Sequence, residues 1–266
     1  LLRRWIGQPL LDITHLERRL DAVDFFHQEM FTREKIRSEL GNVSDIERIV
    51  ARILINKASP RDLLGLKSSL ESVEVLLGLL LKGEKVGLSK GIHSFQDIRK
   101  LIDISISPQT GTNPGDGDVI REGFSEELDE LRTASKSARA FIASLEKNER
   151  ETTGIKNLRV GYNRVFGYYI EISKSNLDDV PDYYERRQTL VNGERFVTPK
   201  LKEYEILILS AKDRIAVLER ALFVQVCAQI GIESEGLTRL ADKLAGLDIL
   251  TNLAEIAHRN GYVKPV

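Results

Sequence analysis

The sequence has little sulfur and lacks the apolar continuity of a membrane protein. Its single cysteine, Cys227, cannot form an internal disulfide, which suits a reducing cytoplasm. Because Cys227 stands in the apolar helical stretch 223–230, we interpret it as a packed core thiol. No uninterrupted apolar run approaches the ~20 residues that cross a bilayer, so we expect no membrane partner. Residues 1–6 contain neither an initiator Met nor a signal peptide, which we interpret as the start of an excised fragment.

Recognised catalytic patterns are missing as well. The sequence contains no phosphate-binding loop of the form G-x-x-x-x-G-K-[ST], and no serine or cysteine lies in a nucleophile elbow. The histidines are isolated from one another and from the cysteine, so that none stands at metal-ligand spacing; they are His15, His27, His93 and His258. We therefore predict that this chain is not an enzyme and holds no metal or cofactor of its own.

The overall charge sets a further limit. The net charge is −1, with 30% charged and 42% apolar residues, a composition typical of a soluble globular protein. A generally basic nucleic-acid binder is therefore not indicated. Any contact with a polyanion has to come from a local patch.

Most of the chain is predicted to be helical, because apolar residues recur at spacings of three and four. We expect helices over residues 12–31, 44–55, 60–81 and 94–103. Asp45, and Ser59 followed by Pro60, supply start signals for two of them. The segment 105–118 is rich in Gly, Pro and Thr, which predicts an irregular loop.

Two later segments carry the narrow apolar stripe of a coiled coil. Ser125 predicts the start of the first, whose stripe is formed by Leu128, Leu131, Ser135, Ala138, Ile142 and Leu145. The stripe of the second is formed by Leu201, Tyr204, Ile208, Ala211, Ile215, Leu218 and Leu222. Two helices of about 30 residues with matching stripes are expected to pair antiparallel over roughly 45 Å. A last helix is expected over residues 235–260.

The stretch between these two helices has a different pattern. Residues 158–162 and 168–172 alternate at period two, and strand formers flank the pair Asn192-Gly193. Such a pair is typical of a two-residue hairpin turn, which requires positive φ angles. We predict a small antiparallel sheet over residues 155–200, held at the far end of the paired helices.

This stretch is also unusual in composition. Six of the seven tyrosines fall between residues 162 and 204, and nine basic residues face seven acidic ones between 155 and 204, a local charge of 9 − 7 = +2. Aromatic side chains interleaved with Arg and Lys are typical of nucleic-acid contact. A small sheet also needs tyrosines to build its own core, so composition leaves both interpretations open.

Several motifs in this chain occur in the same order in a known family. The segment 162–171 (YNRVFGYYIE) resembles the clamp signature of the MutS family of DNA mismatch repair proteins. The segment 186–196 (RRQTLVNGERF) is similar to the second clamp block of that family, and 201–205 (LKEYE) to the start of its returning helix. Further similarities occur in 2–10, 58–63, 126–132 and 244–250.

The resemblance implies a mainly α fold, in which a multi-helical core carries a long antiparallel helical lever with a small antiparallel β clamp domain at its tip. The implied parts are a helical core domain (1–124), an outgoing lever helix (125–154), a β-rich clamp (155–200) and returning lever helices (201–266). The mismatch-binding, connector and ATPase domains of the family are not expected in this chain.

The implied function is binding to the backbone of double-stranded DNA without sequence preference, coupled in the intact protein to its ATPase state. ATP and Mg are expected only in the ATPase domain of the parent protein. A second MutS subunit and MutL are the other implied partners. The implied location is the bacterial cytoplasm, with association to the nucleoid during repair.

The resemblance also points to individual side chains. Arg187 and Asn192 stand where the family places residues that contact the DNA backbone. Arg186, Arg195 and Lys174 are further candidates, although the two arginines could instead brace the sheet through glutamates at positions 185 or 194.

Two positions depart from the family pattern at the predicted turn. Val191 stands where relatives often have lysine, and Gly193 where alanine is common. Both departures imply a tighter turn with one phosphate contact fewer.

Two other functions remain open at this point. The chain could be a coiled-coil structural or interaction module whose β part binds a protein, and duplex affinity would then be weak at any salt concentration. It could also be a MutS homologue that acts in recombination rather than in mismatch recognition.

Overall fold

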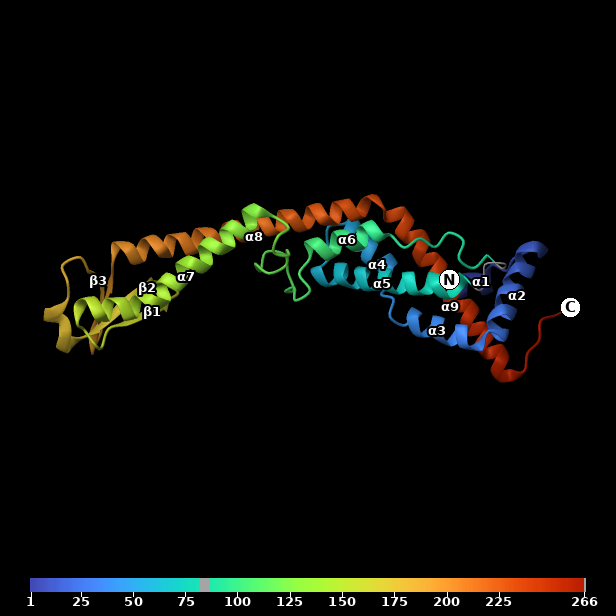
Figure 1. Ribbon diagram of the computed structural model, residues 1–266, viewed down its shortest axis with the longest axis horizontal. Coiled ribbons are helices and arrows are strands. Elements are labelled where there is room, and N and C mark those ends of the chain that lie inside the picture. Colours follow the sequence, from blue (N-terminus) through green and yellow to red (C-terminus); the bar gives the residue numbers. More distant parts are fainter. Residues whose placement is uncertain (82–86, 266) are drawn as a thin grey trace. The chain divides into compact units, whose positions relative to one another are not determined.

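The computed structural model describes residues 1–81 and 87–265; residues 82–86, which belong to the predicted core domain, and residue 266 lie outside the description. The chain forms two compact units (Figure 1). Unit 1 consists of Leu1–Arg121 and Ala221–Val266, and unit 2 of Glu122–Arg220. A mainly α fold with a small antiparallel sheet is thus confirmed.

Unit 1 is helical in the part of the chain that the structure describes. Its helices are α1 (Leu2–Gly7), α2 (Ile13–Gln28), α3 (Met30–Leu40), α4 (Ile46–Leu54), α5 (Pro60–Leu80), α6 (Gln96–Ser105), the end of α8 (Pro199–Ile232) and α9 (Ser234–Asn260). The predicted helices over 44–55, 60–81, 94–103 and 235–260 are confirmed to within a few residues. The irregular loop over 105–118 is also confirmed, apart from a single bridge between Ile106 and Ile120.

The predicted helix over 12–31 is wrong at its end. The backbone leaves the helical region at Glu29 (φ −90°, ψ 62°), and a separate helix, α3, follows. The guanidinium of Arg33 donates to the carbonyl oxygens of Phe26 (2.8 Å) and His27 (3.3 Å), which lie in the last turn of α2. These bonds satisfy carbonyl groups that a helix end leaves without partners. Helix α1 was not predicted either.

The residues predicted to begin two of these helices do cap them. The Asp45 side chain accepts from the backbone N–H of Arg48 (3.0 Å). Ser59 and Asp62 form a reciprocal capping box at the start of α5, with Pro60 in the first turn. Such caps satisfy backbone donors that no helical carbonyl can reach.

Helix α9 packs against α2, α3 and α4 within unit 1. The buried Arg33 is held there by Glu255 of α9 at 3.1 Å. Cys227 is buried, as predicted, and burial together with the nearby Asp62 carboxylate raises the pKa of its thiol to about 11.

Unit 2 begins with α7 (Glu126–Thr153), which the Ser125 side chain caps by accepting from the N–H of Leu128. Helix α7 runs antiparallel to the part of α8 that belongs to unit 2. The Phe141 and Tyr204 rings stack at 3.8 Å, and toward the other end Arg132 pairs with the buried Glu219 at 3.0 Å. Both predicted stripes are largely buried; their buried members are Leu128, Ser135, Ala138, Ile142, Leu145, Leu201, Ile208, Ala211 and Ile215.

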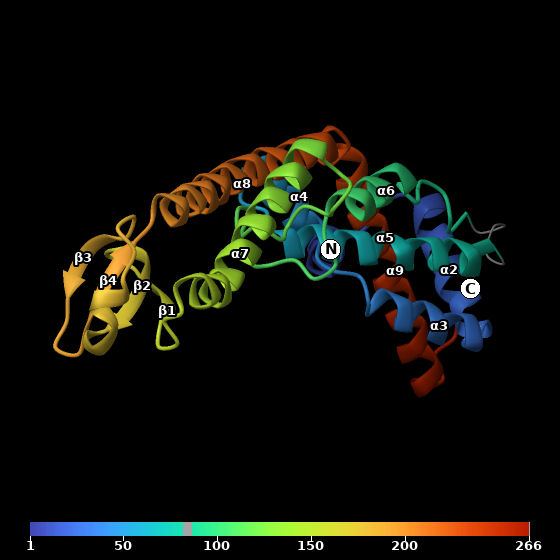
Figure 2. The same cartoon turned by 60° about the vertical axis from the view of Figure 1, so that its left-hand side comes forward.

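Unit 2 also contains a four-stranded antiparallel sheet (Figure 2). The strands are β1 (Arg159–Asn163), β2 (Gly167–Ser173), β3 (Glu185–Thr189) and β4 (Gly193–Val197), in the order β1-β2-β4-β3. A short 3₁₀ helix, Lys174–Asp179, which was not predicted, connects β2 to β3. The predicted strands over 158–162 and 168–172 are confirmed to within one residue.

The turn between β3 and β4 differs from the expected one. The hydrogen bond from Leu190 N–H to the Gly193 carbonyl (2.8 Å) encloses Val191 and Asn192 as the central residues. Neither Asn192 nor Gly193 has a positive φ angle, so the conformation predicted for the Asn-Gly pair is wrong. Gly193 is required for another reason: a Cβ atom there would overlap the backbone oxygen of Ile172 on the neighbouring strand.

One face of the sheet is buried against both helices. Ile170, Ile172 and Phe196 form a single core cluster with Ile142 of α7 and Leu201 of α8. A small isolated sheet is marginally stable in water, so this burial is what holds the strands together. The opposite face of the sheet is left for polar side chains.

Helix α8 is long and apolar enough, by length and composition alone, to count as a candidate membrane span. A third of its most apolar stretch is buried within the protein, and packed core helices of other proteins can have the same length and composition. Glu219 of this helix is buried and forms an ion pair with Arg132 of α7. We therefore interpret α8 as a helix that packs within the protein, since length and composition alone are weak evidence for a membrane span.

We predict that Gly193→Ala destabilises unit 2 by about 1–3 kcal/mol, because the added methyl group must push β4 away from β2. The measurement is urea unfolding followed by the near-ultraviolet circular dichroism of tyrosine, since six of the seven tyrosines lie in unit 2. The fluorescence of Trp5, the only tryptophan, reports unit 1 and should not change.

Gly78→Ala is the matched control for this substitution. Gly78 lies exposed in α5 with no atom near its missing Cβ, so alanine should stabilise unit 1 by about 1 kcal/mol. An unchanged tyrosine transition in Gly193→Ala would show that the strands do not approach as closely as the structure has them.

Candidate nucleic-acid interface

The strand register places polar side chains in one row across the exposed face of the sheet. Arg159 of β1 lies opposite Glu171 of β2, Glu171 lies opposite Arg195 of β4, and Arg195 lies opposite Gln188 of β3. The neighbouring register position, Ile170 opposite Phe196, points into the core. Alternation along each strand therefore separates an apolar inner face from a charged outer face.

Arg195, a predicted site residue, is engaged within this row. Its guanidinium donates to Glu171 at 2.9 Å and to Gln188 at 3.0 Å, and it lies over the ring of Tyr169 at 4.1 Å. The side chain is only 20% exposed. The structure thus gives Arg195 a bracing role, although its carboxylate partner is Glu171 and not one of the two glutamates considered from the sequence.

Arg186 and Arg187 are more accessible. Arg186 is 65% exposed and pairs with Glu194 at 3.2 Å, as one of the predicted alternatives had it. Arg187 is 46% exposed and pairs with Glu185 at 3.2 Å. Surface ion pairs of this kind are weak, so either guanidinium can exchange its carboxylate for another anion.

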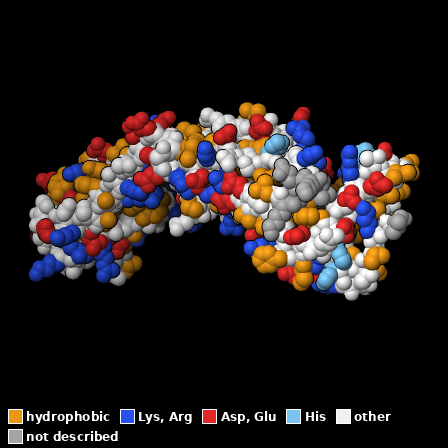
Figure 3. Space-filling model, turned by 45° about the vertical axis from the view of Figure 1, so that its right-hand side comes forward, with side chains coloured by type: hydrophobic (Ala, Val, Ile, Leu, Met, Phe, Trp, Pro, Cys, Tyr) orange, Lys and Arg blue, Asp and Glu red, His pale blue; other side chains and the backbone are white. Residues whose placement is uncertain are grey.

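Asn192 and Lys174 lie next to each other beside the β3–β4 turn. The backbone N–H of Lys174 donates to the backbone oxygen of Asn192 at 3.2 Å, and both side chains are exposed. Over residues 1–81 and 87–265, neither the Asn192 amide nor the Lys174 ammonium group has a hydrogen-bonding or ionic partner. Val191, the other central residue of the turn, is also exposed. The basic side chains are interspersed with acidic ones on the surface (Figure 3).

Glutamates on both helices hold the sheet by hydrogen bonds that the sequence did not reveal. Glu146 of α7 accepts from the backbone N–H of Val160 (3.0 Å), and Glu205 of α8 accepts from that of Tyr168 (2.9 Å). Glu149 of α7 accepts from the Tyr184 hydroxyl at 2.7 Å. Burial, and then this bond to Glu149, raises the pKa of the Tyr184 hydroxyl.

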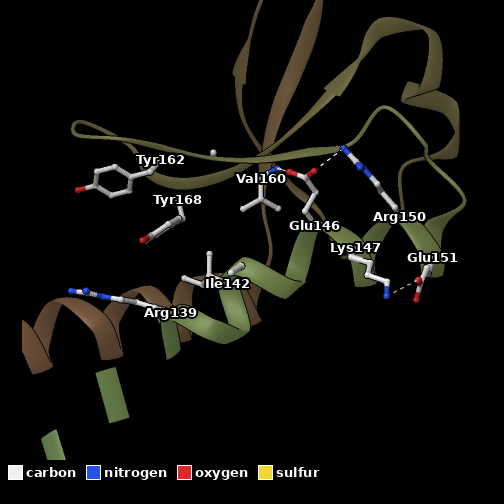
Figure 4. A pocket seen from close by; sticks show the side chains of 11 residues that line it. Arg139, Ile142, Glu146, Lys147, Arg150, Glu151, Val160, Tyr162 and Tyr168 are labelled. Atoms are coloured by element: carbon white, nitrogen blue, oxygen red, sulfur yellow. Dashed lines mark hydrogen bonds and ion pairs between the residues drawn. The ribbon is translucent and has the colours of Figure 1, made fainter. Parts of the chain in front are cut away.

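A groove of about 760 Å³ lies between α7 and the β1–β2 hairpin (Figure 4). The Tyr162 and Tyr168 rings, 4.9 Å apart, line it together with Ile142 and Arg139 of α7. Figure 4 shows that the ion pairs Lys147–Glu151 and Arg150–Glu146 line the remainder.

A second groove, of about 350 Å³, lies beside the β3–β4 turn. Lys156 and Asn157, which follow α7, line it together with Arg159, Ser173 and Asn192. These side chains offer ammonium, guanidinium and amide donors, which suit an anionic ligand. Within the part of the chain that the structure describes, no group of His, Cys, Asp or Glu is arranged to bind a metal ion.

Comparison with known proteins identifies the family. Residues 123–214 match the family description "MutS family domain IV", a range that nearly coincides with unit 2. The whole chain is 46% identical to part of the DNA mismatch repair protein MutS of Dehalococcoides mccartyi. It is 41% identical to that of Desulforamulus reducens and 44% identical to that of Thermotoga sp., again over its full length. The chain belongs to the MutS family. It spans about a third of the length of these curated relatives (31% to 33%).

The MutS resemblance selected the turn but not the groove beside it. Lys156 and Arg159 contribute to the local positive charge of the segment, but they lie outside 162–171 and 186–196, the two segments that resemble the clamp of the family. The buried Ile155 and Leu158, which flank Lys156 and Asn157, are the signal in the sequence that these two polar side chains project outward.

In this MutS-family chain we predict that Glu205→Ala loosens the β1–β2 hairpin, because the Tyr168 N–H loses a charged acceptor worth about 1.5–3 kcal/mol. Hydrogen exchange at the Tyr168 amide should become faster by one to two orders of magnitude (about 1.4 kcal/mol per tenfold). Glu203→Ala is the control, because Glu203 lies on the same turn of α8 and has no hydrogen-bonding or ionic partner among residues 1–81 and 87–265. Unchanged exchange in Glu205→Ala would show that this bond does not hold the hairpin.

Proposed function

We propose that this chain binds the backbone of duplex DNA without sequence preference, as the clamp and lever part of a DNA mismatch repair MutS protein. The observation that carries the proposal is the coincidence of the matched range 123–214 with a compact unit that exposes Arg187 on strand β3 and Asn192 in the turn between β3 and β4. The relatives are named as DNA mismatch repair proteins, which makes DNA the natural polyanion.

The chemistry of unit 2 supports backbone contact more than base reading. Guanidinium, ammonium and amide groups donate to phosphate oxygens, which are the same at every base pair. Arg187 and Asn192 are the leading residues of the proposed contact, with Arg186 and Lys174 as secondary ones. Arg195 is assigned to the sheet itself, because its guanidinium is already held on three sides.

We further propose the parts implied by the resemblance: a helical core over 1–124, an outgoing lever helix over 125–154, a clamp over 155–200 and returning lever helices over 201–266. The antiparallel contacts between α7 and α8 in unit 2 support the lever, because paired helices transmit a rotation better than a flexible linker does. In the intact protein, ATP and Mg in another domain would set the clamp state, with a second MutS subunit and MutL as partners in the bacterial cytoplasm.

We predict that Arg187→Ala weakens duplex binding equally for matched and mismatched DNA. The slope of log affinity against log salt is negative, and a lost phosphate contact reduces its magnitude by about 0.9, whatever the DNA sequence. Fluorescence anisotropy with labelled duplexes between about 50 and 200 mM salt measures both quantities.

Glu185→Gln is the matched control, because it removes the carboxylate partner of Arg187 and keeps the guanidinium. Its duplex affinity should equal or exceed that of the unaltered chain. A loss confined to mismatched DNA would contradict the positioning role of Arg187. Negligible duplex affinity at every salt concentration would favour a protein-binding module instead.

A further inference from the structure

The basic side chains of unit 2 differ in whether a carboxylate neutralises them. Arg186, Arg187 and Arg195 each lie within 3.2 Å of a glutamate oxygen. Lys156 and Arg159 are exposed, and over residues 1–81 and 87–265 neither has a carboxylate within ion-pair distance. A cation without a partner attracts an incoming anion without first losing another interaction.

The strand order explains why Arg159 is left without a partner. Strand β1 is at the edge of the sheet, so Arg159 has a cross-strand neighbour on one side only, which is Glu171. The Glu171 carboxylate is taken by Arg195 at 2.9 Å from the other side. The single carboxylate of Glu171 can offset only one of the two positive charges beside it, and the charge of Arg159 at the edge of the sheet is not offset.

Buried neighbours hold Lys156 in place. Ile155 and Leu158 are fully buried on either side of Lys156 and Asn157. The guanidinium of Arg150 donates to the backbone oxygen of Leu158 at 2.8 Å and pairs with Glu146 at 2.7 Å. The short connection between α7 and β1 is therefore anchored, and its polar side chains project from it.

Lys156, Arg159 and Asn192 line the same groove of about 350 Å³ beside the β3–β4 turn. Resting on the proposed function, we infer that this groove is a phosphate subsite for the nucleic-acid backbone, with Lys156 and Arg159 as contact residues in addition to Asn192.

The lining of the groove selects the chemical class of its ligand. It contains no aromatic side chain on which a base could stack, in contrast to the Tyr162–Tyr168 groove on the other side of β1. Its donors are Lys156, Arg159 and the amides of Asn157 and Asn192. The other arginine, Arg150, is paired with Glu146, and the carboxylate of Glu171 is paired with Arg195. The groove therefore fits a phosphodiester and gives no preference for one base over another.

The test is the double variant Lys156→Ala/Arg159→Ala in the 266-residue chain, measured by anisotropy with a labelled duplex. Two lost phosphate contacts should reduce the magnitude of the slope of log affinity against log salt by about 1.8, equally for matched and mismatched DNA. Lys136→Ala/Lys212→Ala, which removes the same charge from exposed sites on α7 and α8, should leave the slope unchanged. Arg159→Lys should retain the binding that Arg159→Ala loses. The tyrosine near-ultraviolet signal verifies that each variant keeps the fold of unit 2.

The outcomes separate this inference from the proposed function. If the groove variant keeps the full salt dependence while Arg187→Ala weakens it, the subsite is wrong and duplex binding through Arg187 stands. If the control pair lowers the slope as much as the groove pair, the effect is general electrostatic attraction and the subsite is again wrong. If the unaltered chain shows no salt-dependent duplex binding, both fall.

Discussion

Unit 2 depends on two helices covering one face of a four-stranded sheet. Strands of five to seven residues bury too little area to be stable alone, and Ile170, Ile172 and Phe196 find their apolar partners on α7 and α8. Apolar burial alone would permit the sheet to slide on the helices. The bonds from Val160 N–H to Glu146 and from Tyr168 N–H to Glu205 restrict that freedom, because each requires one register. The charged outer face is a consequence of this arrangement.

Periodicity predicted the elements where a local pattern decides them. The cap at Ser125 and the buried stripes of α7 and α8 follow from side-chain spacing alone. The break at Glu29 does not, since the apolar pattern continues through it and the decisive contacts of Arg33 include Glu255, more than two hundred residues away. The Asn192-Gly193 pair was misjudged for a related reason: Gly193 is needed by the neighbouring strand and not by its own φ angle.

The candidate site was predictable as a segment but not as a set of free charges. Motif order selected the hairpin of β3 and β4 with Arg187 and Asn192, and the alternative that Arg195 braces the sheet could be stated from the sequence. Its partner could not, because cross-strand neighbours depend on the strand order and on the register shift between Arg186 and Gln188. Glu171 is far from Arg195 along the chain and becomes its neighbour only when β4 inserts between β2 and β3.

A chain with a net charge of −1 can still attract a polyanion, provided that its carboxylates are hydrogen-bonded or ion-paired within the protein. Four carboxylates of unit 2 have such partners. Glu146 and Glu205 accept hydrogen bonds from backbone N–H groups, Glu149 accepts one from the Tyr184 hydroxyl, and Glu171 pairs with Arg195. Each of these carboxylates contributes less to the electrostatic field outside the protein than its formal charge suggests, because a nearby donor offsets its charge. Cations at the sheet edge are not offset in this way. The same hydrogen bonds that hold the sheet on its helices therefore determine where the surface is locally positive.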